Sequence, residues 1–154
     1  MKKIETFDAE LREQYKYEFL MSKVLWFILG GIGTFFMLIP VQAIWEDSLL
    51  LIGFVLPLAG TSFWLRPYMV IAEKGKIVSV FQKLKWAPIS KKEIRLARIK
   101  YVSEFCLKVL VVAVVLQQIS SALSGTFGIA SLLYPIIVWG VIWITQVIYI
   151  YSLK

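Results

Sequence analysis

The positive charges of this chain all lie on one side of four apolar runs, and this asymmetry limits the architectures open to it. Of the 17 Lys and Arg residues, five fall in residues 1–23, eleven in 66–108 and one at Lys154. None falls in 24–65 or 109–153. Lys and Arg near the ends of membrane spans favour the cytoplasmic side. The pattern therefore predicts that both termini and one long basic loop are cytoplasmic.

The four apolar runs have lengths that suit a bilayer, whose hydrocarbon core needs about 20 helical residues to cross. We therefore expect an all-α, multi-pass protein of the plasma (cytoplasmic) membrane, of bacterial inner-membrane type. The expected membrane domain covers residues 24–154. Its spans are predicted at 24–45, 49–65, 105–123 and 127–151, and the basic loop at 66–104.

Residues 1–23 carry five acidic and five basic side chains, with apolar residues at helical spacing between them. The apolar residues are Ile4, Phe7, Leu11, Tyr15 and Phe19. This periodicity indicates one apolar helix face. We predict an amphipathic cytoplasmic helix at the membrane surface that leads into the first span, and a solvated tail is the alternative.

The first half of the basic loop admits two readings. Residues 70–73 and 77–80 flank Lys74-Gly75 and could form a β-hairpin. The apolar spacing from Ile77 to Leu84 instead follows one face of a helix. We favour the helix, which would begin at Gly75 and end at Pro88.

A second helix start follows directly. In Ser90-Lys91-Lys92-Glu93, the Ser90 hydroxyl can accept from the Glu93 amide while the Glu93 carboxylate reaches back to the Ser90 amide. Ile89 and Ile94 stand at the hydrophobic-staple positions. The sequence predicts a capped helix that continues without a breaker into the span at 105–123.

Polar and small residues within the predicted spans indicate helix contacts. Gln117, Gln118 and Gln146 could line a polar path or form hydrogen bonds between helices, and we favour the second reading. Small residues at four-residue spacing predict close helix packing. The predicted packing residues are Gln117, Gln118, Ser120, Ser121, Ser124 and Gly125.

Composition excludes several classes of function. One cysteine and no histidine argue against a zinc site and against a disulfide within the chain. The acidic pair Glu46 and Asp47 is adjacent in sequence and falls outside the spans, and no phosphate-binding G-x-x-x-x-G-K-[ST] motif exists. We expect no enzyme activity, cofactor or metal. The net charge of +7 follows from the charge placement, so we expect no nucleic-acid partner.

Residues 81–102 resemble the segment between the second and third spans of ABC-2 type exporter permeases. That segment often holds a short amphipathic helix, then a Leu-Pro-(Val/Ile)-Ser-(Arg/Lys)-(Lys/Arg)-Glu-Ile stretch, then a basic helix. The matching residues here are Leu84, Pro88, Ile89, Ser90, Lys91, Lys92, Glu93, Ile94 and Lys100, with Ala87 where leucine is usual. The family usually has six spans, whereas four are predicted here.

The resemblance implies a membrane subunit of an export system, driven by a separate ATP-binding subunit through residues 76–103 and working with another membrane chain as a homo- or hetero-oligomer. The predicted coupling residues are Phe81, Lys83, Leu84, Lys85, Trp86, Pro88, Ile89, Ser90, Lys91, Lys92, Glu93, Ile94 and Arg95. The alternative is a non-transporting accessory, immunity or scaffold protein whose basic loop binds a partner or anionic lipid. A small channel is a third reading.

Overall fold

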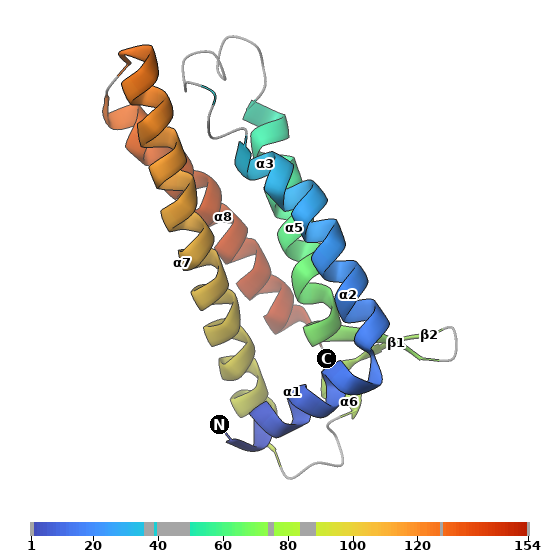
Figure 1. Ribbon diagram of the computed structural model, residues 1–154. Helices are drawn as coiled ribbons and strands as arrows, with labels where there is room; N and C mark the ends of the chain where they lie inside the picture. The colour runs from blue at the N-terminus through green and yellow to red at the C-terminus, as the bar shows by residue number, and fades with distance from the viewer. Residues whose placement is uncertain are drawn as a thin grey trace.

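Two helical hairpins lie side by side, and a short helix crosses one end of them (Figure 1). The computed structural model describes residues 2–35, 39, 50–73, 76–83, 89–126 and 128–153. The fold is all-α, with one two-stranded hairpin. Its elements are α1 (Lys2–Gln14), α2 (Lys16–Leu25), a π-helical segment (Trp26–Gly30), α3 (Gly31–Phe35), α5 (Leu50–Met69), β1 (Val70–Glu73), β2 (Lys76–Ser79), α6 (Val80–Lys83), α7 (Lys91–Ser124) and α8 (Ile129–Ser152).

Both chain ends, the β-hairpin and the start of α7 gather at the same end of the bundle (Figure 1). The Arg95 guanidinium donates to the Leu153 carbonyl at 3.4 Å, which ties the start of α7 to the end of α8. Helix α2 packs on α5 and α7 packs on α8, so segments that follow each other in the chain are neighbours. The sequence also predicts an outer turn at 46–48 and a helix kink at Pro40, and both lie outside the described residues.

Two helical segments are long and apolar enough to cross a membrane, Lys16–Phe35 and Ile129–Ser152. The first begins eight residues before the predicted start at residue 24. The segment begins at Lys16 because the backbone breaks at Tyr15, and from there α2 continues through the π-helical segment into α3.

The second predicted segment also differs from its expected limits. Helix α5 runs to Met69, and Pro67, predicted to help end it at residue 65, lies inside its last turn. Tyr68 and Met69 are buried there, so continuing the helix brings two large side chains into the interior. That burial offsets the single backbone hydrogen bond which a proline removes.

Glycines let α5 approach the first helical segment closely. A Cβ added at Gly60 would lie 2.5 Å from the Gly30 backbone nitrogen, and one at Gly33 would collide with the Pro57 ring. The sequence predicts that Gly30, Gly31 and Gly33 permit close helix packing, and this is confirmed for Gly30 and Gly33. It is wrong for Gly31, where no described atom lies within 4 Å of an added Cβ.

The predicted helix from Gly75 to Pro88 is wrong in its first part, where the structure has the β-hairpin instead. Strands β1 and β2 are antiparallel, with Ile71 opposite Val78 and Ala72 opposite Ile77. β-Branched residues suit a pleated, half-buried surface. Pairing also buries Ile71 to 1% exposure. Among the described residues of the predicted helix, Val80–Lys83 are helical and form α6, and residues 84–88 lie outside the described part.

Candidate functional site: a charged cleft at one end of the bundle

The end of the bundle that carries the termini is built on an apolar cluster, which we call the end cluster. Its buried members come from six elements. They are Leu11, Phe19, Tyr68, Ile71, Val80, Phe81 and Ile94, with Phe7, Tyr15 and Ile89 half-buried against them. The cluster joins α1, α2, the end of α5, the β-hairpin, α6 and the start of α7 into one packed unit.

The predicted apolar face of residues 1–23 is confirmed as a buried face, but it packs on protein rather than on a membrane surface. Ile4, Leu11 and Phe19 are all below 9% exposed. The helix is not continuous, because the backbone breaks at Tyr15 with φ −114° and ψ 35°. The break lets α1 turn across the end of the bundle, where its apolar side chains reach the β-hairpin.

The capping box at the start of α7 is confirmed. The Glu93 amide donates to the Ser90 hydroxyl at 3.2 Å, and the Ser90 amide donates to the Glu93 carboxylate at 2.8 Å. From this start α7 continues as one helix of 34 residues to Ser124. Gly125 ends it with φ 65°, in the left-handed region that glycine favours.

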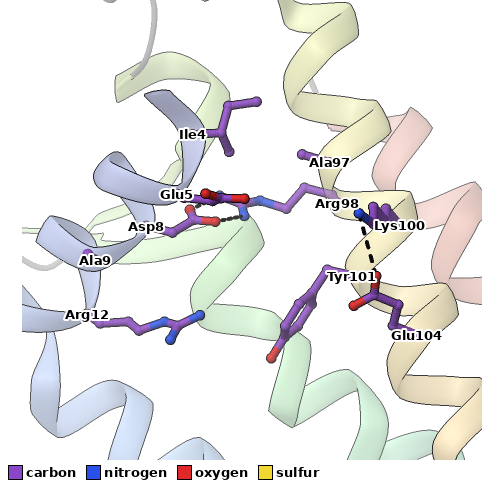
Figure 2. A pocket seen from close by; sticks show the side chains of 10 residues that line it. All are labelled: Ile4, Glu5, Asp8, Ala9, Arg12, Ala97, Arg98, Lys100, Tyr101 and Glu104. Carbon is purple, nitrogen blue, oxygen red and sulfur yellow. Dashed lines mark hydrogen bonds and ion pairs between the residues drawn. The ribbon is translucent and has the colours of Figure 1, made fainter. Parts of the chain in front are cut away.

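A cleft of about 380 Å³ lies between α1 and the first third of α7 (Figure 2). Asp8 of α1 and Arg98 of α7 reach toward each other across it. Both terminal nitrogens of Arg98 donate to the Asp8 carboxylate, each at 2.6 Å. The Arg98 side chain is only 2% exposed and that of Asp8 17%. This bidentate pair is a strong form of ion pair, because the planar guanidinium matches the carboxylate.

The aromatic ring of Tyr68 lies beside the Arg98–Asp8 ion pair. The guanidinium groups of Arg12 and Arg98 lie 5.4 and 5.6 Å from the centroid of its ring. Cations over an aromatic face are attracted by the ring's negative potential. Burial, followed by the interaction with the Tyr101 hydroxyl, raises the pKa of Tyr68 well above its ordinary value. The phenol therefore stays protonated at physiological pH.

Among the described residues that line the cleft, the charges balance. They include three acids, Glu5, Asp8 and Glu104, and three cations, Arg12, Arg98 and Lys100. Lys100 and Glu104 form an exposed pair at 3.7 Å. No group of three or more potential metal ligands occurs among the described residues. The cleft is thus suited to holding α1 on α7.

Sequence reasoning missed Asp8 and Arg98 as interacting residues, although a signal existed. Asp8 lies four residues after Ile4, and Arg98 lies four residues after Ile94. Each charge therefore falls on a helix face that is otherwise buried. A buried-face position occupied by a charge predicts a partner of opposite sign, although the sequence does not say which one.

The predicted coupling residues divide into two groups in the structure. Phe81 and Ile94 are buried in the end cluster, Ile89 is half-buried, and Arg95 stacks its guanidinium near Phe81 and Tyr151. The exposed ones are Ser90, Lys91, Lys92 and Glu93. Lys83 is in α6. Leu84, Lys85, Trp86 and Pro88 lie outside the described residues.

The predicted packing residues also divide. Gln117, Ser120 and Ser121 are buried within the chain, whereas Ser124 and Gly125 are exposed at the end of α7. Gln118 donates to the Ser131 hydroxyl of α8 at 3.5 Å. Gln117 donates to the Ile39 carbonyl at 3.5 Å.

The third predicted intramembrane glutamine makes the shortest of these contacts. Gln146 donates to the Ser62 hydroxyl of α5 at 2.8 Å. The three glutamines therefore bond to other segments of the chain, in agreement with the favoured reading.

Comparisons with known proteins identify no relative of this chain. No family model matches the sequence, and searches of curated proteins and of solved structures give no match.

Proposed function

We propose that this chain is the membrane subunit of an ABC-2-like export system, and that a separate ATPase drives it through residues 76–103. The proposal includes four membrane spans, with the end that carries the termini in the cytoplasm. Two of these spans correspond to the helical segments that are long and apolar enough to cross a bilayer.

The distribution of side chains over the bundle supports four spans. Large apolar residues are exposed along α7 and α8, as at Leu107, Val111 and Ile137. Polar residues such as Thr61, Gln117 and Gln146 are buried between helices. Soluble proteins rarely expose apolar surface this extensively, and a bilayer is the surrounding that stabilises it.

The observation that carries the coupling mechanism is the continuity of α7. One helix runs from the capped start at Lys91, through the cleft at Arg98, to Ser124 at the far end of the bundle. At 1.5 Å per residue its length is about 50 Å. A helix without an internal break transmits a displacement at its start into the bilayer.

The partner surface in this proposal is narrower than the sequence suggested. Since Phe81 and Ile94 are already packed in the end cluster, the ATPase would contact the exposed N-terminal end of α7. That end carries Lys91 and Lys92, and Leu96 adds an apolar side chain that is 55% exposed. A partner with an acidic surface around a small apolar patch fits these residues.

Crosslinking in native membranes tests the proposal. The cysteine of a Lys92→Cys variant should crosslink to a protein that carries a nucleotide-binding phosphate loop, and adding Lys91→Glu to that variant should reduce the product. A cysteine at Lys76 on the β-hairpin is the matched control and should give less of it. Crosslinks only to lipid or to this chain would contradict coupling to an ATPase.

The same burial supports a second candidate, a non-transporting accessory or scaffold protein. The apolar side chains expected to bind a partner are used inside the chain, so the unit at the end of the bundle is self-contained. This candidate predicts that the purified chain is stable alone, and that export in its host continues when the gene is deleted.

A further inference from the structure

We propose that the groove between α5 and α8, beside the β-hairpin, binds the phosphate headgroup of an anionic phospholipid. The site is separate from the charged cleft, because it lies on other helices. The inference rests on the membrane location in the proposed function but does not depend on coupling to an ATPase.

The groove has a volume of about 360 Å³ and is lined by both apolar and polar side chains. The apolar ones include Phe63, Val70 and Ile77, and Ile77 is 68% exposed. The polar ones include Arg66, Thr145 and Tyr149. A volume of this size suits a small polar headgroup, so the acyl chains would remain outside it.

Two side chains of the groove can donate hydrogen bonds to a ligand. Arg66 contributes the guanidinium, and Tyr149, exposed to 40%, contributes a phenolic hydroxyl. Among the described residues that line the groove, none carries a carboxylate. A guanidinium beside a hydroxyl, without a competing acid, is the chemistry that binds a phosphate group.

A comparison with the neighbouring groove decides the side on which the headgroup lies. Arg66, Phe63, Val70 and Ile77 also line a groove of about 250 Å³ between α2 and α5. That groove contains Glu18, whose carboxylate repels a phosphate. The headgroup is therefore assigned to the α5–α8 side of Arg66.

The surroundings fix the source of the phosphate as a lipid. Arg66 lies near the end of α5, and α8 is one of the two segments with the length and composition of a span. Ile144 and Ile148 are exposed on α8 within one turn of the groove residues Thr145 and Tyr149. Acyl chains can pack on these side chains while the phosphate reaches Arg66. A free phosphate ion has no acyl chains and would not make these apolar contacts.

Native mass spectrometry of the full-length protein in detergent, with added dioleoyl phosphatidylglycerol or phosphatidylcholine, tests this site. The wild type should retain phosphatidylglycerol preferentially. Arg66→Gln should reduce that preference about fivefold, the effect expected for one cation beside an anionic headgroup. Lys92→Gln, which removes an exposed cation at the N-terminal end of α7, is the matched control and should leave the preference unchanged.

A second pair of variants tests the hydroxyl donor. Tyr149→Phe should weaken retention, whereas Tyr151→Phe on the same helix should not, because Tyr151 does not line the groove. Equal effects of Arg66→Gln and Lys92→Gln would overturn the site, as would equal retention of the two lipids.

Two further results separate the alternatives. Displacement of the lipid by glycerol 3-phosphate at equal concentration would show that a free phosphate is the ligand, and would also overturn the proposal. If the wild type fractionates with membranes but shows no lipid preference, only this inference fails. If it does not fractionate with membranes, the proposed function fails as well.

Discussion

At the scale of single residues, Arg98 stands out as the charged side chain that the described part of the fold buries. Its two terminal nitrogens bond to Asp8, whereas its Nε is buried without a partner among the described residues. A buried cation is tolerated when its counter-charge is held in good geometry. Removing the counter-charge of a buried cation therefore destabilises the fold more than removing one charge of an exposed ion pair.

We expect Asp8→Asn to destabilise the docking of α1 by on the order of 3 kcal/mol, because it leaves Arg98 buried without its counter-charge. Hydrogen exchange over residues 2–14 measures the effect. Glu104→Gln, which breaks the exposed pair with Lys100, is the control, and its effect should stay below about 0.5 kcal/mol. Equal exchange in the two variants would contradict an anchoring role for the Arg98–Asp8 pair.

Tyr68 gives a prediction of pH dependence. Burial raises its folded pKa above the ordinary value of 10.0, so the folded state holds the phenolic proton more tightly than the unfolded chain. This contribution to stability is fully present below pH 10 and is lost as the pH rises further. The midpoint temperature of thermal unfolding in detergent should fall more steeply between pH 8 and pH 11 for the wild type than for Tyr68→Phe. Parallel curves would refute the interpretation.

At the scale of elements, local signals and packing contribute differently to each helix and strand. The start of α7 is a local feature, since the capping box involves only residues 90–93. The β-hairpin is a packing feature, because its chain could also form a helix. The next two predictions follow from this difference.

Ser90→Ala should destabilise the first turn of α7 by about 1 kcal/mol, because the Glu93 amide loses its acceptor. Faster hydrogen exchange at residues 91–94 is the expected result. Ser90→Asp keeps an oxygen acceptor and should restore most of the protection. No difference between the Ala and Asp variants would show that the cap does not stabilise this turn.

The two isoleucines of the β-hairpin form a matched pair of opposite exposure. Ile71 is 1% exposed in the end cluster, whereas Ile77 is 68% exposed. Ile71→Ala should lower the unfolding free energy by about 2–5 kcal/mol, because it removes buried methyl groups and leaves a cavity. Ile77→Ala should change it by less than about 0.5 kcal/mol. Protease resistance of the hairpin compares the two, and a reversed order would contradict the strand register.

At the scale of the whole molecule, the bundle has two chemically different ends. One end carries the termini, the β-hairpin and the charged cleft, and the other carries the end of α7 and the start of α8 (Figure 1). Apolar side chains cover much of the surface between them. This arrangement suits a molecule that crosses a bilayer.

The two ends of α7 should be accessible from opposite sides of the membrane. In a Cys106→Ser background, a cysteine at Lys92 should react with an impermeant reagent only after the membrane is opened. A cysteine at Ser124 should react from outside in intact cells. Both positions are exposed, so burial does not limit the reaction. Labelling of both from the same side would refute the four-span topology.

Particular residues show how far the sequence alone reaches. The capping box at Ser90 and the burial of Ile4, Leu11 and Phe19 were predictable, because each depends on spacing within one segment. The choice between strand and helix at residues 76–79 was not. Both forms satisfy the local pattern, and only the contact of Ile71 with the end cluster distinguishes them.

The sequence by itself determined the apolar segments, the stretches of chain to which Lys and Arg are confined, and the start of α7. Each of these can be read locally, because composition, periodicity and capping involve residues close in the chain. Only the tertiary structure decided that α1 turns at Tyr15, that Phe81 and Ile94 become core residues, and that Arg98 meets Asp8. Those two charges are 90 residues apart. Their pairing depends on how separate helices pack, and that packing is set by the shapes of all the faces in contact rather than by any one segment.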